Sequence, residues 1–370
     1  MRIVQLVPAM EQGGVERGVV EMNRALVAAG HENVVVSDGG RLVERIEADG
    51  GRHVRLDVKS KNPLTCIPRA LALRRTLREV RPDVVVAHSR VPAWLFVIAN
   101  RALGLRWITF AHGANSISRY SRVMTAGELT VTPSRYIADY LKAAYGIPEE
   151  RLRVIPRAID RDRFDPSRLD AVFVAEKREE WGLAGRRVVM GVGRITQLKG
   201  YDTLIRATAA ARRRVPELKT VIVGEAEALR RDVEASLRAL VAELGLEDAV
   251  VFAGNQQKVA ECLSLADVVV SANTRKPEAF GRSMAEALAM NRPVVATAFG
   301  GALDIVEDGK NGVLVPVEAA DADGFADAIV RALSSGWGDV RTAAIEKFSF
   351  ERMVAASLAV YGEFRPGGRG

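Results

Sequence analysis

The sequence predicts an α/β protein with two domains, each built around a parallel sheet. Short runs of β-branched and other apolar residues alternate with amphipathic segments along the chain. These runs are continuously apolar, as in parallel strands that helices cover on both faces. A charged segment with two prolines, residues 156–166, interrupts the alternation near the middle. Because a domain has about 150 residues, a chain of 370 residues has room for two.

The first half opens with the pattern of a βαβ unit. An apolar run over 3–7 precedes an amphipathic segment over 15–29 and a second apolar run over 34–37. More strands and helices are expected before the interruption. The strands are 53–56, 84–87, 107–111, 129–132 and 153–155, and the helices are 68–80, 92–103 and 134–145.

A second alternating series follows the interruption, and an amphipathic helix over about 350–364 closes the chain. We therefore expect an N-terminal domain over 1–165 and a C-terminal domain over 166–349. The terminal segment, 350–370, could pack on either domain, including a return to the first. The expected strands of the second series are 188–191, 219–223, 250–252, 268–271, 293–297 and 313–315, and its helices include 202–214, 228–244 and 283–290.

The composition excludes several classes of protein. With 48% hydrophobic residues the chain can bury a sizeable core, and its two distant cysteines form neither a disulfide framework nor a metal motif. No run approaches the roughly 18–20 apolar residues of a membrane-spanning helix. Residues 1–8 are a short apolar run broken by proline, which predicts a strand rather than a signal peptide. We expect a cytoplasmic protein.

The formal net charge of +7 suggests an anionic partner, whether nucleic acid, an anionic membrane or a phosphorylated ligand. Basic residues gather in the first half, where 84–127 contains no Asp or Glu and Glu79 alone opposes seven Lys and Arg within 59–81. A basic amphipathic helix can dock peripherally on the inner face of the plasma membrane, or it can pack on a sheet with solvated arginines. Both interpretations stay open. The residues concerned are Leu71, Leu73, Arg74, Arg75, Leu77, Arg78 and Val80, with Trp94, Phe96 and Trp107 nearby in the sequence.

Gly13-Gly14-Val15-Glu16 follows the first expected strand and opens a helix. Glycines let a ligand approach the backbone, and a helix N-terminus offers N–H groups to an anion. The GxGxxG fingerprint is not met, which disfavours a nicotinamide dehydrogenase. A plain strand-to-helix turn is the alternative.

Gly193 and Arg194 end the first strand of the second series, and Lys199 lies in the loop that follows. An Arg and a Lys at the carboxyl end of a strand suit a pyrophosphate, because they neutralise charge on a departing phosphate. An ordinary solvated pair is the alternative. A Walker motif is absent.

Glu278 lies in a loop, and Glu286 lies about one turn into a helix that begins near Gly281. Carboxylates accept hydrogen bonds from sugar hydroxyls, and the backbone amides of Gly281, Arg282 and Ser283 can bind phosphate. A nucleotide sugar needs both kinds of contact. The two glutamates could instead be capping charges.

His112 follows the strand expected over 107–111, and His88 ends the strand over 84–87. A polar ring at the carboxyl end of a strand is a candidate cleft residue. His31 and His53 look structural. For any one of these histidines, a satisfied structural role is the alternative.

In this order the motifs resemble those of the retaining glycosyltransferases of family 4, which have the GT-B fold of two Rossmann-like domains facing a central cleft. The likeness spans nearly the whole chain, and two glutamates separated by seven residues are quite specific when they follow the Arg/Lys pair. The stretch EAFGRS also resembles bacterial lipopolysaccharide and exopolysaccharide transferases. The matching stretches are GGVE, the strand-end His112, GVGR with Lys199, EAFGRSMAE, and Gly300-Gly301 with 304–312.

The resemblance implies catalytic roles for His112, Arg194, Lys199 and Glu278. Arg194 and Lys199 would hold the donor pyrophosphate and stabilise the leaving nucleoside diphosphate. Glu278 would contact the donor sugar, Glu286 the ribose, and His112 would face the sugar near the reaction centre. The implied donor-binding set is Gly13, Gly14, Gly193, Arg194, Lys199, Phe252, Asn255, Phe280, Gly281, Arg282, Ser283 and Glu286.

The implied reaction moves a hexose from a UDP- or GDP-linked sugar to a glycan or lipid-linked acceptor, in lipopolysaccharide or exopolysaccharide synthesis. No metal and no cofactor are implied, because Arg, Lys and a helix end take the place of a metal. A GT-B nucleotide-sugar epimerase or hydrolase and a non-catalytic nucleotide-sugar binder remain alternatives. No RNP, KH or zinc pattern supports a nucleic-acid partner.

Two positions depart from the family pattern. The linker usually contains Asn-Gly before Ile/Val-Asp, whereas this chain has Arg157-Ala158. Asp304 replaces the common Glu in the loop after Gly301. The first change puts the geometry of the linker in doubt, and neither touches the paired glutamates.

Overall fold

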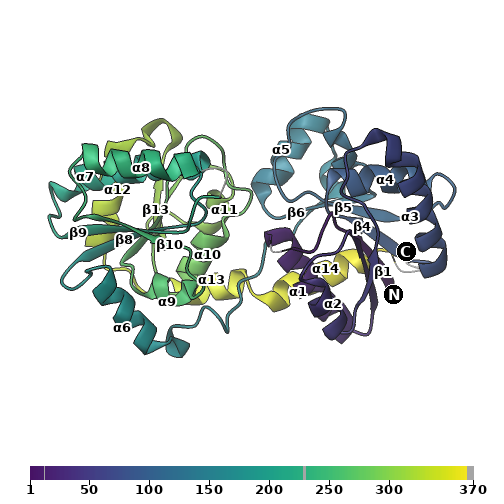
Figure 1. The fold of residues 1–370 in the computed structure, drawn as a ribbon, viewed down its shortest axis with the longest axis horizontal. Coiled ribbons are helices and arrows are strands. Elements are labelled where there is room, and N and C mark those ends of the chain that lie inside the picture. The colour runs from purple at the N-terminus through teal and green to yellow at the C-terminus, as the bar shows by residue number, and fades with distance from the viewer. Residues whose placement is uncertain (12, 228–230, 365–370) are drawn as a thin grey trace. The chain divides into compact units, whose positions relative to one another are not determined.

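The computed structural model describes residues 1–11, 13–227 and 231–364, which form two compact units (Figure 1). The first unit contains Met1–Arg157 and the C-terminal segment from Glu351, and the second contains Ala158–Phe350. Each unit is a single parallel sheet between layers of helices.

The first unit has a seven-stranded sheet in the order β3-β2-β1-β4-β5-β6-β7. All its neighbouring strands pair in parallel. The strands are β1 (Arg2–Leu6), β2 (Glu32–Ser37), β3 (Arg52–Arg55), β4 (Val84–Ala87), β5 (Trp107–Phe110), β6 (Leu129–Thr132) and β7 (Leu152–Val154). The helices are α1 (Gly14–Ala28), α2 (Val43–Ala48), α3 (Cys66–Val80), α4 (Arg90–Asn100), α5 (Arg135–Tyr145) and α14 (Phe350–Gly362), the last of which belongs here from its second residue.

The second unit has a six-stranded parallel sheet in the order β10-β9-β8-β11-β12-β13. The strands are β8 (Arg187–Val192), β9 (Leu218–Val223), β10 (Val250–Gly254), β11 (Val268–Ser271), β12 (Val294–Thr297) and β13 (Gly312–Val315). The helices are α6 (Ala171–Glu180), α7 (Tyr201–Arg212), α8 (Arg231–Glu243), α9 (Val259–Ser264), α10 (Arg282–Ala289), α11 (Ala302–Ile305), α12 (Ala322–Ser334) and α13 (Arg341–Lys347).

Each sheet has one place where the strand order reverses. In the first unit β1 lies between β2 and β4, and in the second β8 lies between β9 and β11. In open α/β sheets, ligands bind outside the carboxyl ends of the strands at such a switch point. The loops after β1, β4, β8 and β11 are therefore the places to look for a site.

Local sequence explains which face of a helix is buried and where a helix begins. In α1, Val19, Met22 and Leu26 recur at helical spacing and are buried. At the start of α5, the Ser134 hydroxyl accepts a hydrogen bond from the backbone N–H of Ile137.

The predicted strands all occur, with ends shifted by a few residues. The helix expected over 228–244 is described from Arg231, and its first three residues lie outside the described part of the chain.

The break between the units falls after Arg157, earlier than the boundary expected at 165. The reason is burial: Ile159 and Phe164 pack in the hydrophobic core of the second unit. The backbone N–H of Ile159 also donates a 2.9 Å hydrogen bond to the carbonyl oxygen of Phe348. The residues predicted as a linker are thus largely part of the second unit.

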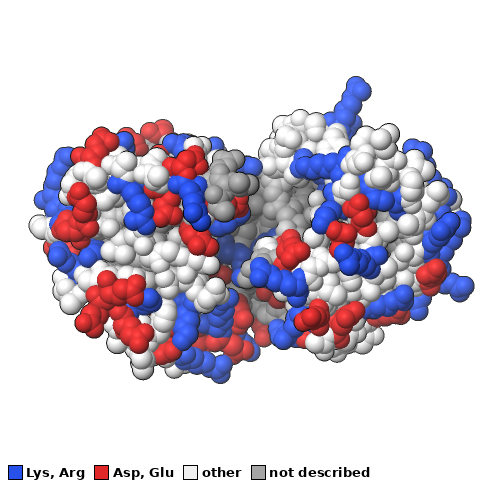
Figure 2. All heavy atoms as spheres, in the orientation of Figure 1, with Lys and Arg blue, Asp and Glu red and all other residues white. Residues whose placement is uncertain are grey.

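Helix α14 returns to the first unit. Val360 and Tyr361 are buried, and Glu363 forms a 3.0 Å ion pair with Arg153 of β7. On the face drawn in Figure 2, basic and acidic side chains are scattered over both units among uncharged residues. Within the described residues, none of the helices is both long enough and apolar enough to cross a bilayer.

Candidate active site

The loop after β8 carries the two predicted cations of the second unit. β8 ends at Val192, and Gly193 follows with φ 142°, a conformation that favours glycine. A short 3₁₀ turn over Gln197–Lys199 leads to Gly200, which has φ 66°. A Cβ atom on Gly200 would lie 1.8 Å from the carbonyl oxygen of Ala272, so glycine permits this loop to pack against the chain that follows β11.

Lys199 meets Glu278 where these two loops pack together. Nζ of Lys199 lies 2.5 Å from Oε1 of Glu278, and the Asn273 side chain donates a 3.0 Å hydrogen bond to the same oxygen. Burial raises the pKa of the Glu278 carboxyl, but the charge of Lys199 and the two hydrogen bonds outweigh burial and hold that pKa below its usual range. Glu278 is therefore ionised at neutral pH.

Arg194 lies in the same loop as Lys199 but pairs with a different carboxylate. Its guanidinium donates a hydrogen bond to Glu227, and both side chains are exposed. Arg194, Glu227, Gly193 and Asn255 line a cavity of about 380 Å³ at the carboxyl ends of β8, β9 and β10. The Tyr201 hydroxyl donates a 2.8 Å hydrogen bond to the Gly193 carbonyl and holds the rim of this cavity. The lining of the cavity thus combines the cation of Arg194 with the carboxylates of Glu225 and Glu227 and with polar groups such as Asn255.

Helix α10 begins four residues after Glu278. Gly281 is its N-cap with φ 101°, and no side-chain hydrogen bond caps it among the described residues. Glu286 lies one turn further on, with Oε1 3.4 Å from Nε of Arg282. The Phe280 ring is buried and packs edge-on against Phe348 with ring centroids 5.4 Å apart. Only the backbone of Phe280 is therefore available to contact a ligand.

The glycine pair after β12 holds the Glu278 segment in place. The Gly301 N–H donates a 2.8 Å hydrogen bond to the Glu278 carbonyl. A Cβ atom on Gly301 would lie 2.4 Å from the Phe280 carbonyl oxygen, and one on Gly300 would lie 2.8 Å from that of Glu278. Both glycines are therefore required by close backbone contact. Their presence in the sequence is explained without a ligand.

The second unit therefore brings some of its predicted residues together and leaves others apart. Lys199 contacts Glu278, and Arg194 shares its loop. Glu286 pairs with Arg282 on its own helix. Phe252 lies in β10, where the Arg238 guanidinium covers its ring at 4.4 Å.

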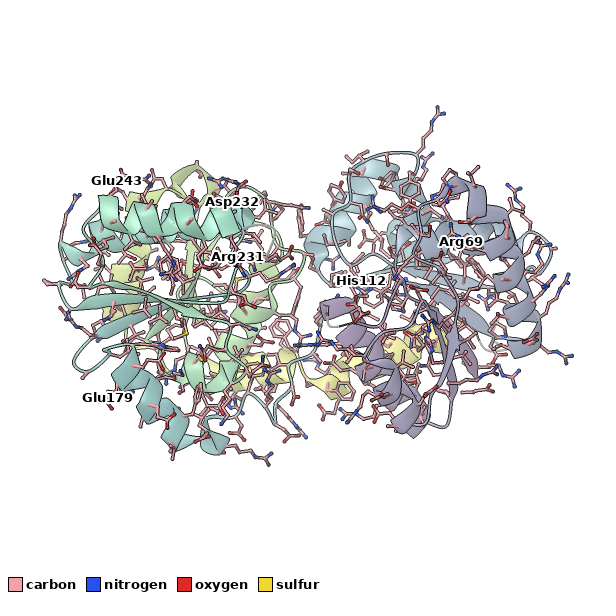
Figure 3. All side chains as sticks on the ribbon, in the orientation of Figure 1. Arg69, His112, Glu179, Arg231, Asp232 and Glu243 are labelled. Carbon is pink, nitrogen blue, oxygen red and sulfur yellow. The ribbon has the colours of Figure 1, made fainter. Side chains whose placement is uncertain are left out.

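In the first unit, the loops after β1, β4 and β5 carry Gly13, His88 and His112. Gly13 is the N-cap of α1, and a Cβ atom there would lie 2.2 Å from the Glu16 carboxylate. His112 follows β5 in the first unit (Figure 3). Its ring stacks on Phe110 with centroids 4.3 Å apart. Nε2 of His112 lies 2.9 Å from Nδ1 of His88. The two strand-end histidines are thus direct partners.

Three residues of these sites were not predicted from the sequence. Asn273 binds Glu278, Glu227 binds Arg194, and Arg157 donates a 3.0 Å hydrogen bond to Nδ1 of His112. Asn273 could have been found, because it also follows a strand at the carboxyl edge. Arg157 stood out only as a departure from the family pattern. Residues 1–11, 13–227 and 231–364 contain no group of three or more His, Cys, Asp or Glu arranged to hold a metal ion.

Two family models match the chain. The model of glycosyl transferases group 1 matches residues 173–347, and the model of Glycosyltransferase Family 4 matches residues 12–163. The matches fall one in each structural unit, apart from a few residues beside the break.

Individual proteins are similar over much of the chain. A GDP-mannose-dependent alpha-(1-6)-phosphatidylinositol monomannoside mannosyltransferase of Mycolicibacterium smegmatis is 33% identical over 70% of this chain and 69% of its own. A D-inositol 3-phosphate glycosyltransferase of Xylanimonas cellulosilytica is 32% identical over 95% of this chain and 92% of its own.

The crystal structure of a glycosyltransferase from Rickettsia africae superposes with a TM-score of 0.88 and 28% identity, covering 98% of both chains. The two-domain α/β fold predicted from the sequence is thereby confirmed.

Proposed function

This chain belongs to the group 1 glycosyltransferases with the GT-B fold, and we propose that it moves a hexose from a nucleoside diphosphate sugar to a glycan or lipid-linked acceptor, with retention of anomeric configuration. We place the reaction in the synthesis of a bacterial lipopolysaccharide or exopolysaccharide. A UDP- or GDP-linked donor is proposed. The name of the similar Mycolicibacterium smegmatis enzyme specifies GDP-mannose and phosphatidylinositol monomannoside, which supports this donor class and a lipid-linked acceptor.

The contact between Lys199 and Glu278 is the observation that carries the proposal. It places a cation and an ionised carboxylate at the carboxyl edge of the sheet, in neighbouring loops at a switch point. A diphosphate needs cations, and a sugar needs a carboxylate that accepts hydrogen bonds from its hydroxyls. One donor molecule that contains both groups explains why the two side chains occur side by side.

In this proposal each group has a defined role. Lys199 and Arg194 bind the diphosphate and stabilise the charge that develops as it leaves. Glu278 orients the sugar, and the first N–H groups of α10 after Gly281 face a phosphate. Glu286 binds the ribose. The reaction as proposed needs neither metal nor cofactor, because two cations and a helix N-terminus carry the charge.

When the donor binds, its diphosphate must replace the carboxylates that already pair with Lys199 and Arg194. Lys199 is held by Glu278, and Arg194 by Glu227. A diphosphate supplies negative charge that can replace a carboxylate on either cation. Glu227 is exposed, so Arg194 can change partner at little cost. Glu278 keeps its hydrogen bond from Asn273 and can turn the other oxygen to the sugar.

We also propose that the first unit docks on an anionic membrane through the start of α3. Leu64 lies in the 3₁₀ turn Pro63–Thr65 just before α3, and Ile67 and Leu71 lie in α3. These three side chains are 87%, 58% and 45% exposed and form an apolar outward face. Arg75 and Arg78 continue that face as exposed cations. An exposed apolar strip followed by basic residues is typical of helices that lie in a membrane interface.

The other half of the predicted amphipathic pattern has a different role. Leu73, Leu77 and Val80 are buried in the hydrophobic core of the first unit, as are Phe96 and Trp107. The interleaved leucines and arginines therefore contain both a core face and an outward face. Only the outward face enters the membrane proposal.

The site proposal is tested by ligand binding and by turnover. Melting temperatures measured with UDP-, GDP-, ADP- and CDP-sugars should rise with one class of donor. Glu278→Gln and Lys199→Ala should each lower the transfer rate about 100- to 1,000-fold and abolish the donor-dependent rise in melting temperature. Glu307→Gln and Lys310→Ala are matched controls, because they break a 3.0 Å Lys–Glu pair elsewhere in the same unit.

Wild-type rates in both site variants would overturn the assignment. The same assay separates the alternative functions. Release of free sugar at full rate without acceptor would favour an epimerase or hydrolase, and donor binding without turnover on any acceptor would favour a binding protein.

A further inference from the structure

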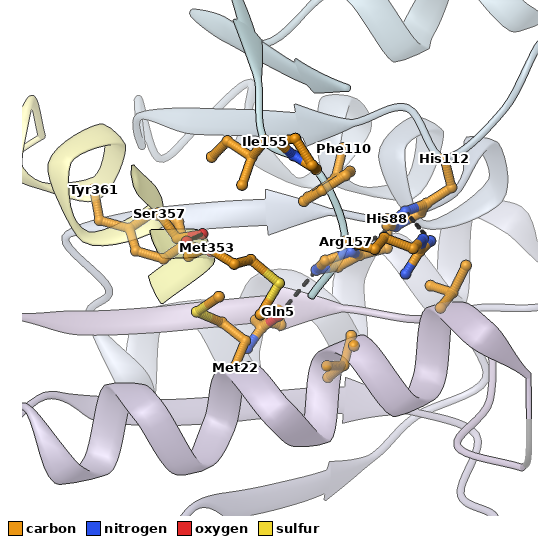
Figure 4. A pocket seen from close by; sticks show the side chains of 14 residues that line it. Gln5, Met22, His88, Phe110, His112, Ile155, Arg157, Met353, Ser357 and Tyr361 are labelled. Carbon is orange, nitrogen blue, oxygen red and sulfur yellow. Dashed lines mark hydrogen bonds between the residues drawn. The ribbon is translucent and has the colours of Figure 1, made fainter. Parts of the chain in front are cut away.

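A continuous chain of hydrogen-bonded side chains runs through the first unit, from Arg157 to the sheet and on to α1. It includes both strand-end histidines (Figure 4). Arg157 donates a 3.0 Å bond to Nδ1 of His112, and Nε2 of His112 lies 2.9 Å from Nδ1 of His88. Nε2 of His88 then lies 3.0 Å from Oε1 of Gln5.

Three buried amides continue the chain. Gln5 donates a 3.0 Å bond to Oδ1 of Asn33, and Asn33 donates a 2.7 Å bond to Oδ1 of Asn23. Asn23 donates a 3.0 Å bond to the backbone carbonyl of Ile46. Gln5, Asn23 and Asn33 are at most 1% exposed, so none of these groups has water as a substitute partner.

The two ends of the chain determine the direction of every bond in it. A carbonyl oxygen can only accept, so Asn23 must turn its NH₂ group to Ile46, and each amide before it must donate in the same sense. A guanidinium can only donate, so Nδ1 of His112 must accept from Arg157.

The constraints at the two ends of the chain leave only one way to place the protons on the two histidines. Oε1 of Gln5 accepts, so Nε2 of His88 carries a proton. Nδ1 of a neutral His88 then accepts, so Nε2 of His112 carries a proton. Each ring is neutral, and both of its nitrogens are occupied.

The chain contains no acceptor for an additional proton on either histidine. A second proton on His112 would point Nδ1–H at an N–H of Arg157. A second proton on His88 would force His112 to accept at Nε2 and again to carry a proton on Nδ1. In either case a donor faces a donor, and the bond between His112 and Arg157 is lost.

The surroundings also oppose a charge. The rings of His88 and His112 border a cavity of about 40 Å³, where α1 presents Val15, Gly18, Val19 and Met22. Burial, with a smaller effect of Arg157, lowers the pKa of His88 to about 3. Burial, Arg157 and His88 lower the pKa of His112 well below its usual range. Tyr361 of α14 also lines the cavity, and burial raises the pKa of its hydroxyl, so it stays neutral.

We propose that Gln5, His88 and Arg157 are positioning residues that hold His112 as an uncharged ring with its proton on Nε2. His112 then meets the sugar as a fixed, neutral surface and does not exchange a proton with the acceptor. Arg157 also donates a 2.9 Å bond to the Gly14 carbonyl, so the same chain fixes the glycine turn before α1. The part of this inference that concerns the sugar rests on the proposed function and on the role that the family resemblance implies for His112.

Nuclear magnetic resonance of the ¹⁵N-histidine-labelled full chain tests the arrangement directly, because the protein has only four histidines. His88 and His112 should both show the neutral Nε2–H form from pH 7.5 to pH 5. An Nδ1–H tautomer or a charged ring at neutral pH, in either residue, would overturn the proposal.

Variants of Arg157 and His88 test the positioning role. Arg157→Leu removes the donor that opposes a proton on Nδ1, so the pKa of His112 should rise toward 6.5 and the transfer rate should become pH-dependent between pH 5.5 and 7.5. Arg157→Met is the second variant if Arg157→Leu unfolds. His88→Leu leaves the Nε2–H of His112 without its acceptor, so the transfer rate should fall. His88→Gln can accept from His112 and donate to Gln5, so it should restore the rate.

His53→Gln is the control, since His53 binds Ser37 outside the chain. An unchanged titration of His112 and an unchanged pH profile in Arg157→Leu, or a wild-type transfer rate in His88→Leu, would refute the positioning role. Wild-type transfer by His112→Leu, with the tautomers as predicted, would instead reject the proposed place of His112 at the reaction centre and leave the hydrogen-bonded chain intact.

Discussion

At Glu278, burial and pairing act on the same carboxyl group in opposite directions. Burial favours the protonated form, whereas Lys199 and Asn273 favour the ionised form, and the ionised form prevails. A carboxylate with such partners stabilises the fold while it stays charged. Its stabilising effect should therefore depend on pH.

We predict that Glu278→Gln lowers the free energy of unfolding at pH 7 and that its difference from wild type narrows in acid. The carboxylate contributes fully above the ordinary pKa of 4.5, and this contribution is lost as the pH falls through the lower pKa of the native state. Urea unfolding of both proteins between pH 3 and pH 7 measures the effect. A constant difference across this range would contradict the prediction.

The control for this experiment is Glu227→Gln. Glu227 also pairs with a cation of the same loop, but its side chain is 57% exposed and that of Arg194 is 73% exposed. Exposed ion pairs contribute about 0–1 kcal/mol. Glu227→Gln should therefore change the free energy of unfolding only slightly at every pH.

At the level of the element, the loop between β8 and α7 depends on Gly200. Gly200 has φ 66°, and a side chain there would collide with the Ala272 carbonyl. Gly245 has φ 62° but has nothing within 4 Å of a Cβ atom. The two glycines share a backbone conformation and differ in the space around them.

We predict that Gly200→Ala destabilises the protein more than Gly245→Ala does. Both substitutions place an alanine in the left-handed region, which costs about 1–2 kcal/mol. Gly200→Ala adds the collision, which should cost about 1–3 kcal/mol more and should move Lys199 away from Glu278. Thermal unfolding and donor binding measure the two effects, and equal losses in the two variants would refute the role of the close contact.

At the level of the whole molecule, the membrane proposal makes the outward face of α3 a functional surface. We predict that the protein floats with vesicles that contain anionic lipid and that the triple change of Leu64, Ile67 and Leu71 to Ser lowers the floated fraction several-fold. Buried apolar area and basic residues both contribute to such binding. Raising the salt concentration should weaken it.

A triple variant of the second unit serves as the control. Val172, Leu303 and Val317 are 68%, 56% and 48% exposed, and changing them to Ser removes a similar apolar area elsewhere. Equal flotation with neutral and anionic vesicles, or equal losses in the two triple variants, would refute docking through α3.

The sequence by itself determined the α/β class, the positions of the strands and the loops that carry charged residues. Apolar runs, helical periodicity and glycines at turns are local properties, so they can be read along the chain. Lys199 and Glu278 could be assigned to loops after strands for this reason, and the resemblance to a family supplied their expected roles.

Only the tertiary structure decided which of these residues meet. Gln5 and His88 are separated by 83 positions, and His112 and Arg157 by 45, so nothing local predicts their hydrogen bonds. The chain through Asn33 and Asn23 exists because β1, β2 and α1 bring buried polar groups together that can be satisfied only by one another. The ends of the chain then select one protonation state for His112, a property that no single residue in the sequence carries.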